Sequence, residues 1–179
     1  VLDEPVKLPA SGSAALSLAR WRMEIALRLD APAALEAAFE PVKSELRPSA
    51  LRAQVLACRA ELAIRQDERE LYEKLITEAL WADSQSRRAQ LTRAIAMLTF
   101  ANARDHYEEA SQLLALVRGP ACNDIPWRAA ELTALEALAL YQCARLEQAE
   151  QTLNRALVEP ADAWARSVRD SVGKLFDVQ

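Results

Sequence analysis

The groups that could do acid–base chemistry are scattered along the chain. Where carboxylates stand together, as in Glu108-Glu109 and Asp67-Glu68, they are consecutive residues. Consecutive side chains on a helix diverge by about 100°, so the two carboxylates of such a pair cannot meet at one substrate. Acidic residues are instead favoured at helix starts, where they face the positive end of the helix dipole. These pairs therefore indicate helix starts and not a catalytic acid and base.

The nucleophilic and metal-binding side chains form no recognisable cluster. His106, the single histidine, falls at a predicted helix start far from any Gly-flanked serine, so a catalytic triad is not expected and a solvated or capping role is. Cys58, Cys122 and Cys143 have spacings that match no zinc pattern. The apolar patterns around Cys58 and Cys143 predict buried thiols that act as small hydrophobes. Cys122 falls in a predicted loop, where it is either a reactive or a paired thiol.

The glycines are too few for a phosphate-binding loop. Only Gly12, Gly119 and Gly173 are present, and they form no nucleotide-binding pattern. We therefore expect no cofactor, no metal and no enzymatic activity. A small-molecule enzyme on a helical scaffold is the alternative, which a screen of hydrolase substrates would test.

Composition and charge indicate an ordinary globular protein. The chain has 179 residues, of which 51% are hydrophobic and 27% charged, and its net charge is -4. Basic and acidic residues are interspersed, which argues against nucleic acid because that partner needs a concentrated basic face. Arg87-Arg88 is the one basic doublet outside a mixed-sign context, and we expect a solvated helix start there.

Apolar runs are too short to cross a membrane. The longest candidate, Leu132 to Tyr141, is interrupted by Glu136 and falls short of the roughly 18 residues required. No signal peptide is recognisable. Residues 1–10 contain two prolines and are expected to form an extended leader before a single domain over 11–179. An anchor upstream of Val1 stays possible.

The secondary structure that positions these side chains is predicted to be helical throughout. Glycine is scarce while Ala and Leu are abundant, and apolar residues recur at three- and four-residue steps. We expect an all-α fold of about nine helices, joined by short turns that make neighbouring helices antiparallel. Expected helix starts include Ser11 or Ser13, Asp30 with Pro32, Ser49, Asp67 with Glu70, Asp83 or Ser84, Asp105, Pro126 and Asp162. Pro41 should end or kink the second helix near Glu40.

Similar residues recur at intervals of 35 to 39 residues. Tyr72-Glu73 and Tyr107-Glu108 lie 35 residues apart, and Ala110 and Ala149 lie 39 apart. A helix–turn–helix unit of about 34 residues is the tetratricopeptide period, in which stacked pairs supply each other's core. The repeats are degenerate, because Met97 stands where a small residue is usual. The pattern predicts a tetratricopeptide-like α-solenoid.

The C-terminal half carries a more specific pattern. Tyr107-Glu108-Glu109-Ala110 and Leu113-Leu114 precede a Gly-Pro loop, which is followed by Pro126-Trp127-Arg128 and an Ala/Leu-rich helix. Over about residues 85–176 this resembles the repeat domain of YfgM-type proteins. The resemblance implies a periplasmic domain with an N-terminal membrane anchor and an accessory role beside the Sec translocon and periplasmic chaperones. The three cysteines are unusual for such a domain, so the cytoplasm stays the alternative compartment.

A stack of helix pairs leaves a surface that can hold a peptide or protein. We expect a non-catalytic protein-interaction scaffold, with a module of a cytoplasmic regulator or secretion chaperone as the alternative. Trp127 is expected to pack between pairs, whereas Trp81 and Trp164 are candidates for contacting a partner. The polar residues predicted to line the groove, from their place on the first helices of pairs, are Arg52, Arg59, Arg93 and Glu131.

Overall fold

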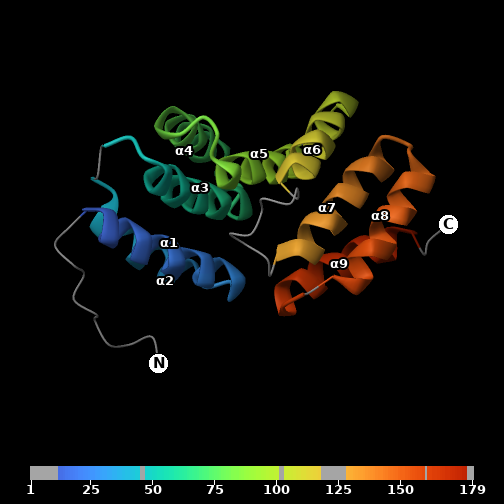
Figure 1. Ribbon diagram of the computed structural model, residues 1–179, viewed down its shortest axis with the longest axis horizontal. Helices are drawn as coiled ribbons and strands as arrows, with labels where there is room; N and C mark the ends of the chain where they lie inside the picture. Colours follow the sequence, from blue (N-terminus) through green and yellow to red (C-terminus); the bar gives the residue numbers. More distant parts are fainter. Residues whose placement is uncertain (1–11, 45–46, 101–102, 118–127, 160, 177–179) are drawn as a thin grey trace. The chain divides into compact units, whose positions relative to one another are not determined.

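The structure is a computed structural model that describes residues 12–44, 47–100, 103–117, 128–159 and 161–176 (Figure 1). All regular structure within these ranges is helical, which confirms the predicted all-α class. None of the described helices is long and apolar enough to span a bilayer. The elements are α1 (Gly12–Arg28), α2 (Pro32–Phe39), the 3-10 helix η1 (Glu40–Val42), α3 (Ala50–Arg65), α4 (Arg69–Ala82), α5 (Arg87–Thr99), α6 (Arg104–Val117), α7 (Ala129–Gln142), α8 (Leu146–Val158) and α9 (Ala163–Phe176).

The chain forms two compact units, residues 1–89 and 90–179, and the boundary between them lies inside α5. Each unit is described by itself below. The single domain predicted over 11–179 stays a prediction.

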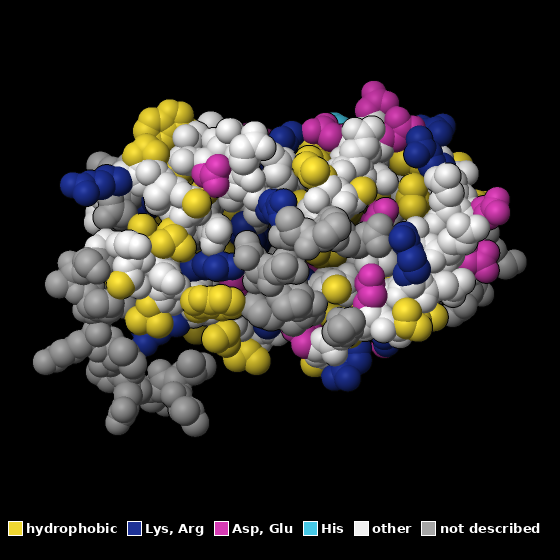
Figure 2. Space-filling model, viewed as in Figure 1, with side chains coloured by type: hydrophobic (Ala, Val, Ile, Leu, Met, Phe, Trp, Pro, Cys, Tyr) yellow, Lys and Arg dark blue, Asp and Glu magenta, His cyan; other side chains and the backbone are white. Residues whose placement is uncertain are grey.

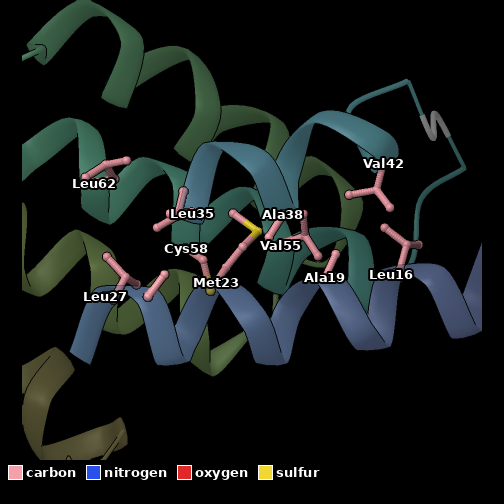
Figure 3. Packing of buried hydrophobic residues seen from close by; sticks show 11 residues of the cluster. Leu16, Ala19, Met23, Leu27, Leu35, Ala38, Val42, Val55, Cys58 and Leu62 are labelled. Carbon is pink, nitrogen blue, oxygen red and sulfur yellow. The ribbon is translucent and has the colours of Figure 1, made fainter. Parts of the chain in front are cut away.

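In the first unit, α1 and α3 are the helices that connect the others. α1 packs against both α2 and α3, and α3 in turn packs along α4. The core between α1, α2 and α3 is apolar, with Met23 and Leu35 fully buried beside Cys58 (Figure 3). These residues follow the three- and four-residue spacing of an amphipathic helix, so the sequence pattern alone orients the helices.

In the second unit, α7 occupies the central place. It packs against α6, α8 and α9. Small residues line its faces, and Ala130, Ala134 and Ala137 are fully buried. Because alanine has a short side chain, the neighbouring helices can approach α7 on several sides. α7 thus contacts the two helices that follow it, α8 and α9, as α1 contacts α2 and α3.

Three helix–helix connections share one turn geometry. α1, α3 and α7 are each followed by three residues before the next helix, and the middle residue has a positive φ: 50° at Asp30, 59° at Asp67 and 60° at Ala144. The next amide in each turn bonds to the carbonyl five residues earlier, at 2.8 to 3.0 Å. This is the left-handed C-terminal cap that reverses the chain after a helix. The three positions lie 37 and 77 residues apart, so one turn recurs at about one and two repeat lengths.

The left-handed residue in the third turn gives a stability prediction. Ala144 has a Cβ and no side-chain oxygen, so its positive φ carries a steric cost that glycine would not. Ala144→Gly should raise the free energy of unfolding by about 0.5–1 kcal/mol. Ala139→Gly, in the interior of α7, should lower it by about 1 kcal/mol. Urea denaturation of both variants checks the pair, and a loss of stability in Ala144→Gly would contradict the assigned turn.

The helix starts show which predicted caps were correct. The Ser49 side chain accepts a hydrogen bond from the Arg52 amide at 3.1 Å, and Asp162 accepts one from the Ala165 amide at 2.8 Å. Pro32 occupies the first turn of α2, and the α-helix ends before Pro41 as expected. The predictions for Asp30 and Asp67 were wrong, because both residues end the preceding helix and cap nothing with their side chains.

Some predictions fall outside the described residues. They concern the leader over 1–10, the Gly119-Pro120 loop, Cys122, Pro126 and Trp127.

Candidate partner-binding surfaces

Two of the predicted groove residues lie on α3 and are held by contacts within the first unit. Arg52 is buried, and its Nη1 donates to the carbonyls of Val42 and Lys43, each at 3.2 Å. Arg59 pairs with Glu36 at 2.8 Å and with Glu68 at 3.7 Å. Arg52 thus stabilises the end of η1, and Arg59 ties α3 to α2 and to the turn before α4. Arg52 offers too little surface to line a groove.

In the second unit, Glu131 is also buried, which differs from the groove position predicted for it. It accepts two hydrogen bonds from Arg128, at 2.8 and 2.9 Å, and one from the Trp164 indole at 3.3 Å. Arg128 is itself fully buried. Trp164 is half-buried, so its polar edge joins α9 to α7. Arg93 is partly exposed and pairs with Glu109 at 2.8 Å.

Trp81 is the predicted partner contact that the structure leaves open to solvent. It lies at the end of α4 with 74% of its surface exposed. An indole this exposed is uncommon, because tryptophan is highly buried on average. Among the six residues proposed from the sequence, Trp81 has the exposure that a binding role requires.

A buried charge cluster in the first unit was not anticipated. Arg88 lies between two carboxylates: its Nε donates to Glu24 Oε1, and its Nη2 lies 2.8 Å from Glu61 Oε2. Arg65 also pairs with Glu61, at 2.9 Å. Arg88, Glu24 and Glu61 are each no more than 5% exposed. The prediction of a solvated helix start was therefore right for Arg87, which is exposed, and wrong for Arg88.

Cys58 is buried, as the apolar pattern predicted, and it borders this charge cluster. Its thiol donates to Glu24 Oε1 at 3.3 Å. Burial, with the Glu24 carboxylate as a further cause, raises the pKa of the thiol far above its ordinary value. The thiolate is the reactive form of cysteine, so the raised pKa makes Cys58 less reactive in the folded protein. Cys143 is likewise buried, and its burial raises its pKa.

The raised pKa of Cys58 makes stability depend on alkaline pH. Below the unfolded-state value of 9.0 the thiol is protonated in both states, and its contribution is fully present. Above that pH only the unfolded chain ionises, so the free energy of unfolding should fall by about 1.4 kcal/mol per pH unit from this group. Cys58→Ala should lack this component in denaturation curves taken from pH 8 to 10.5. Equal slopes in the two proteins would show that Cys58 ionises without unfolding.

A hollow lies between α8 and α9 in the second unit. Its volume is about 700 Å³, and it is open to solvent. Its apolar lining includes Leu146, Leu153, Leu157 and Phe176, and its charged lining comprises Glu150, Arg169, Asp170 and Lys174. Leu146 and Leu157 remain about half exposed. We call this feature the α8–α9 hollow.

A second apolar surface follows α1 in the first unit. Trp21, Ile25 and Leu29 are 39%, 46% and 63% exposed, and Leu18 is half-buried. These four residues, here called the outer face of α1, recur at three- and four-residue steps and point away from the core residues Leu16, Ala19 and Met23. Figure 2 shows hydrophobic side chains gathered over the α1–α2 part of the chain, with Lys or Arg side chains beside them.

Among the residues that the structure describes, neither unit brings metal-binding side chains together: no three His, Cys, Asp or Glu side chains come close enough to hold a metal ion. His106 lies in the first turn of α6, where the sequence predicted it. The α8–α9 hollow and the outer face of α1 each combine exposed apolar side chains with charged neighbours.

No family model, no curated protein and no solved structure matches the chain.

Proposed function

We propose that this protein is a non-catalytic, tetratricopeptide-like scaffold that binds another protein through exposed apolar helix surfaces. The observation that carries the proposal is the α8–α9 hollow, where Leu146 and Leu157 remain about half exposed beside charged side chains. Exposed apolar side chains bordered by polar ones are a feature of protein interaction sites. The recurring left-handed turn supports a repeat architecture, in which stacked helix pairs present binding surface.

The YfgM-type resemblance specifies a compartment and a set of partners for this scaffold. The periplasmic location, the membrane anchor and the role beside the Sec translocon stay predictions of that resemblance. The cytoplasmic regulator or secretion chaperone stays the alternative. The periplasmic and the cytoplasmic proposals both require binding of a protein partner, so one experiment on the α8–α9 hollow tests that shared requirement.

Two substitutions change the hollow without touching the buried core. Leu157→Asp removes an exposed apolar side chain from its lining. Gly173→Trp fills the hollow: a Cβ added at Gly173 meets no other atom within 4 Å, and leaving glycine favours the helix. Leu116→Asp is the matched control, because Leu116 is 64% exposed on α6 and is outside both surfaces.

Affinity capture from an extract of the source cells should recover a protein with the wild type and with Leu116→Asp. Recovery should fall at least about tenfold with Leu157→Asp and Gly173→Trp, as expected for loss of a central apolar contact. Circular dichroism establishes that all four proteins are equally folded. Equal recovery by the hollow variants, or no protein recovered by the wild type, would contradict the proposal.

A further inference from the structure

We infer that the α8–α9 hollow holds a helix of a partner protein that has basic side chains on one border of its apolar stripe and acidic side chains on the other. This rests on the proposed function, and it specifies the chemistry of the partner at the same site. Four observations carry it: the row of leucines on α8, the space beside Gly173, the place of α4 in the first unit, and two charged side chains on opposite rims of the hollow.

The apolar wall of the hollow has the spacing of a helix-packing surface. Leu146, Leu153 and Leu157 of α8 line the hollow and follow one another at steps of seven and four residues. At 1.5 Å per residue this row is about 16 Å long, or about three helical turns. A helix that lies along such a row can place apolar anchors against it on successive turns.

The opposite wall leaves room for a helix to come close. Gly173 lines the hollow from α9, and a Cβ added there meets no other atom within 4 Å. Helix axes pack at 8–10 Å, and the smaller the side chains at the contact, the closer two helices can lie. The missing side chain of Gly173 therefore provides space for a bound helix against α9.

The first unit contains a helix in the comparable position. α1, α2 and α3 contact one another as α7, α8 and α9 do, and α4 packs along α3. The core that α3 and α4 share includes Leu75 and Ile76 of α4, and Phe39 of α2 packs against it. Among the described residues no helix packs along α9 as α4 packs along α3. The first unit is thus an internal precedent for a helix that covers α9 next to α8.

Opposite charges stand on the two rims of the hollow. At about 100° per residue, Glu150 lies on the solvent side of the α8 leucine row, and Lys174 lies on the side of α9 opposite the buried Val172. Both side chains are exposed. The other two charged residues of the lining, Arg169 and Asp170, are joined by hydrogen bonds at 2.9 and 3.0 Å. Within the described residues no ion pair involves Glu150 or Lys174, so both can pair with a partner.

The two rim charges lie at the same end of the hollow. The Tyr141 and Phe176 ring centres are 4.9 Å apart, so the end of α9 lies beside the end of α7, from which a short turn leads into α8. Glu150 is about one turn into α8, and Lys174 is two residues before Phe176. A helix with basic side chains towards α8 and acidic side chains towards α9 complements both rims. A helix with two borders of like charge is repelled by one of them.

Three synthetic peptides test the inference. They share one apolar stripe and one hydrocarbon staple that holds them helical, and they differ only in their borders. The mixed peptide has Lys on one border and Glu on the other, the second has Glu on both, and the third has Lys on both. Fluorescence anisotropy with the full chain should show the mixed peptide binding about three- to tenfold more tightly than the other two, as expected for two exposed charge pairs. The difference should shrink as salt is raised.

Charge-reversed variants should change the preference in a defined way. Lys174→Glu makes both rims acidic and should favour the peptide with Lys on both borders. Glu150→Lys makes both rims basic and should favour the peptide with Glu on both borders. Gly173→Trp should weaken all three peptides at least about tenfold because it fills the hollow, whereas Leu116→Asp should leave all three affinities unchanged.

Several results would overturn the inference. They are equal affinity for the three peptides, binding of none of them, and a preference that the charge-reversed variants leave unchanged. Equally tight binding of an unstapled mixed peptide interrupted by two prolines would assign the hollow to an extended segment instead. Sedimentation showing a dimer that Gly173→Trp disrupts would assign it to a second copy. Any of the first three results, together with protein capture that still depends on Leu157, would leave the proposed function standing.

Discussion

Arg88→Ala should lower the free energy of unfolding by about 3–5 kcal/mol, because it leaves two buried carboxylates without their shared cation. Arg88 contacts Glu24 of α1 and Glu61 of α3, so it joins three helices of the first unit at one point. Total stability of a domain is about 5–15 kcal/mol, so this single change should bring the unit close to unfolding.

The neighbouring arginine supplies the control for that experiment. Arg87→Ala removes the same side chain from an exposed position one residue away and should change stability by no more than about 0.5 kcal/mol. Urea denaturation followed by circular dichroism measures both variants. A similar, small effect of the two substitutions would mean that the Glu24 and Glu61 carboxylates do not depend on Arg88.

Glu131→Ala should have a comparable effect in the second unit, also about 3–5 kcal/mol. It leaves the fully buried Arg128 without the carboxylate that accepts two of its hydrogen bonds, and it removes the acceptor of the Trp164 indole. The double variant Arg128→Met/Glu131→Leu removes both charges and should be less destabilised than Glu131→Ala.

An exposed carboxylate completes the comparison for Glu131. Glu147→Ala, at the solvent-facing start of α8, should cost at most about 0.5 kcal/mol. Thermal unfolding of the wild type, the two single variants and the double variant ranks their stabilities. A double variant less stable than Glu131→Ala would contradict the prediction, because it would show that the cost does not come from leaving Arg128 buried without its carboxylate.

The helices and their buried faces could be predicted from the sequence because that information is local. Apolar residues at three- and four-residue steps identified core-facing residues such as Met23 and Val55. Ser49, Pro32 and Asp162 marked helix starts correctly. The roles of Asp30 and Asp67 could not be separated in the same way. In a three-residue turn, an aspartate suits both the left-handed end of one helix and the cap of the next, and here the first role applies.

The buried charges could not be predicted, because their partners are distant in the chain. Glu24 on α1 and Arg88 at the start of α5 are 64 residues apart, and only the tertiary fold brings them together. From the sequence alone, a glutamate such as Glu24 is expected on the solvent-facing side of its helix. For the same reason Arg52 and Glu131 were expected on a groove, whereas their hydrogen-bonding partners place them inside. Trp81 is 74% exposed, and its role as a partner contact stays a prediction.

Site-specific photo-crosslinking in the source cells tests protein binding through the α8–α9 hollow most directly. A benzophenone side chain placed at Leu157 or Leu146 should form a covalent adduct with one partner protein after illumination, because both positions are exposed within the hollow. The same group at Leu116 should not form that adduct. Absence of any adduct from the hollow positions, or the same adducts from all three, would contradict a binding role for this surface.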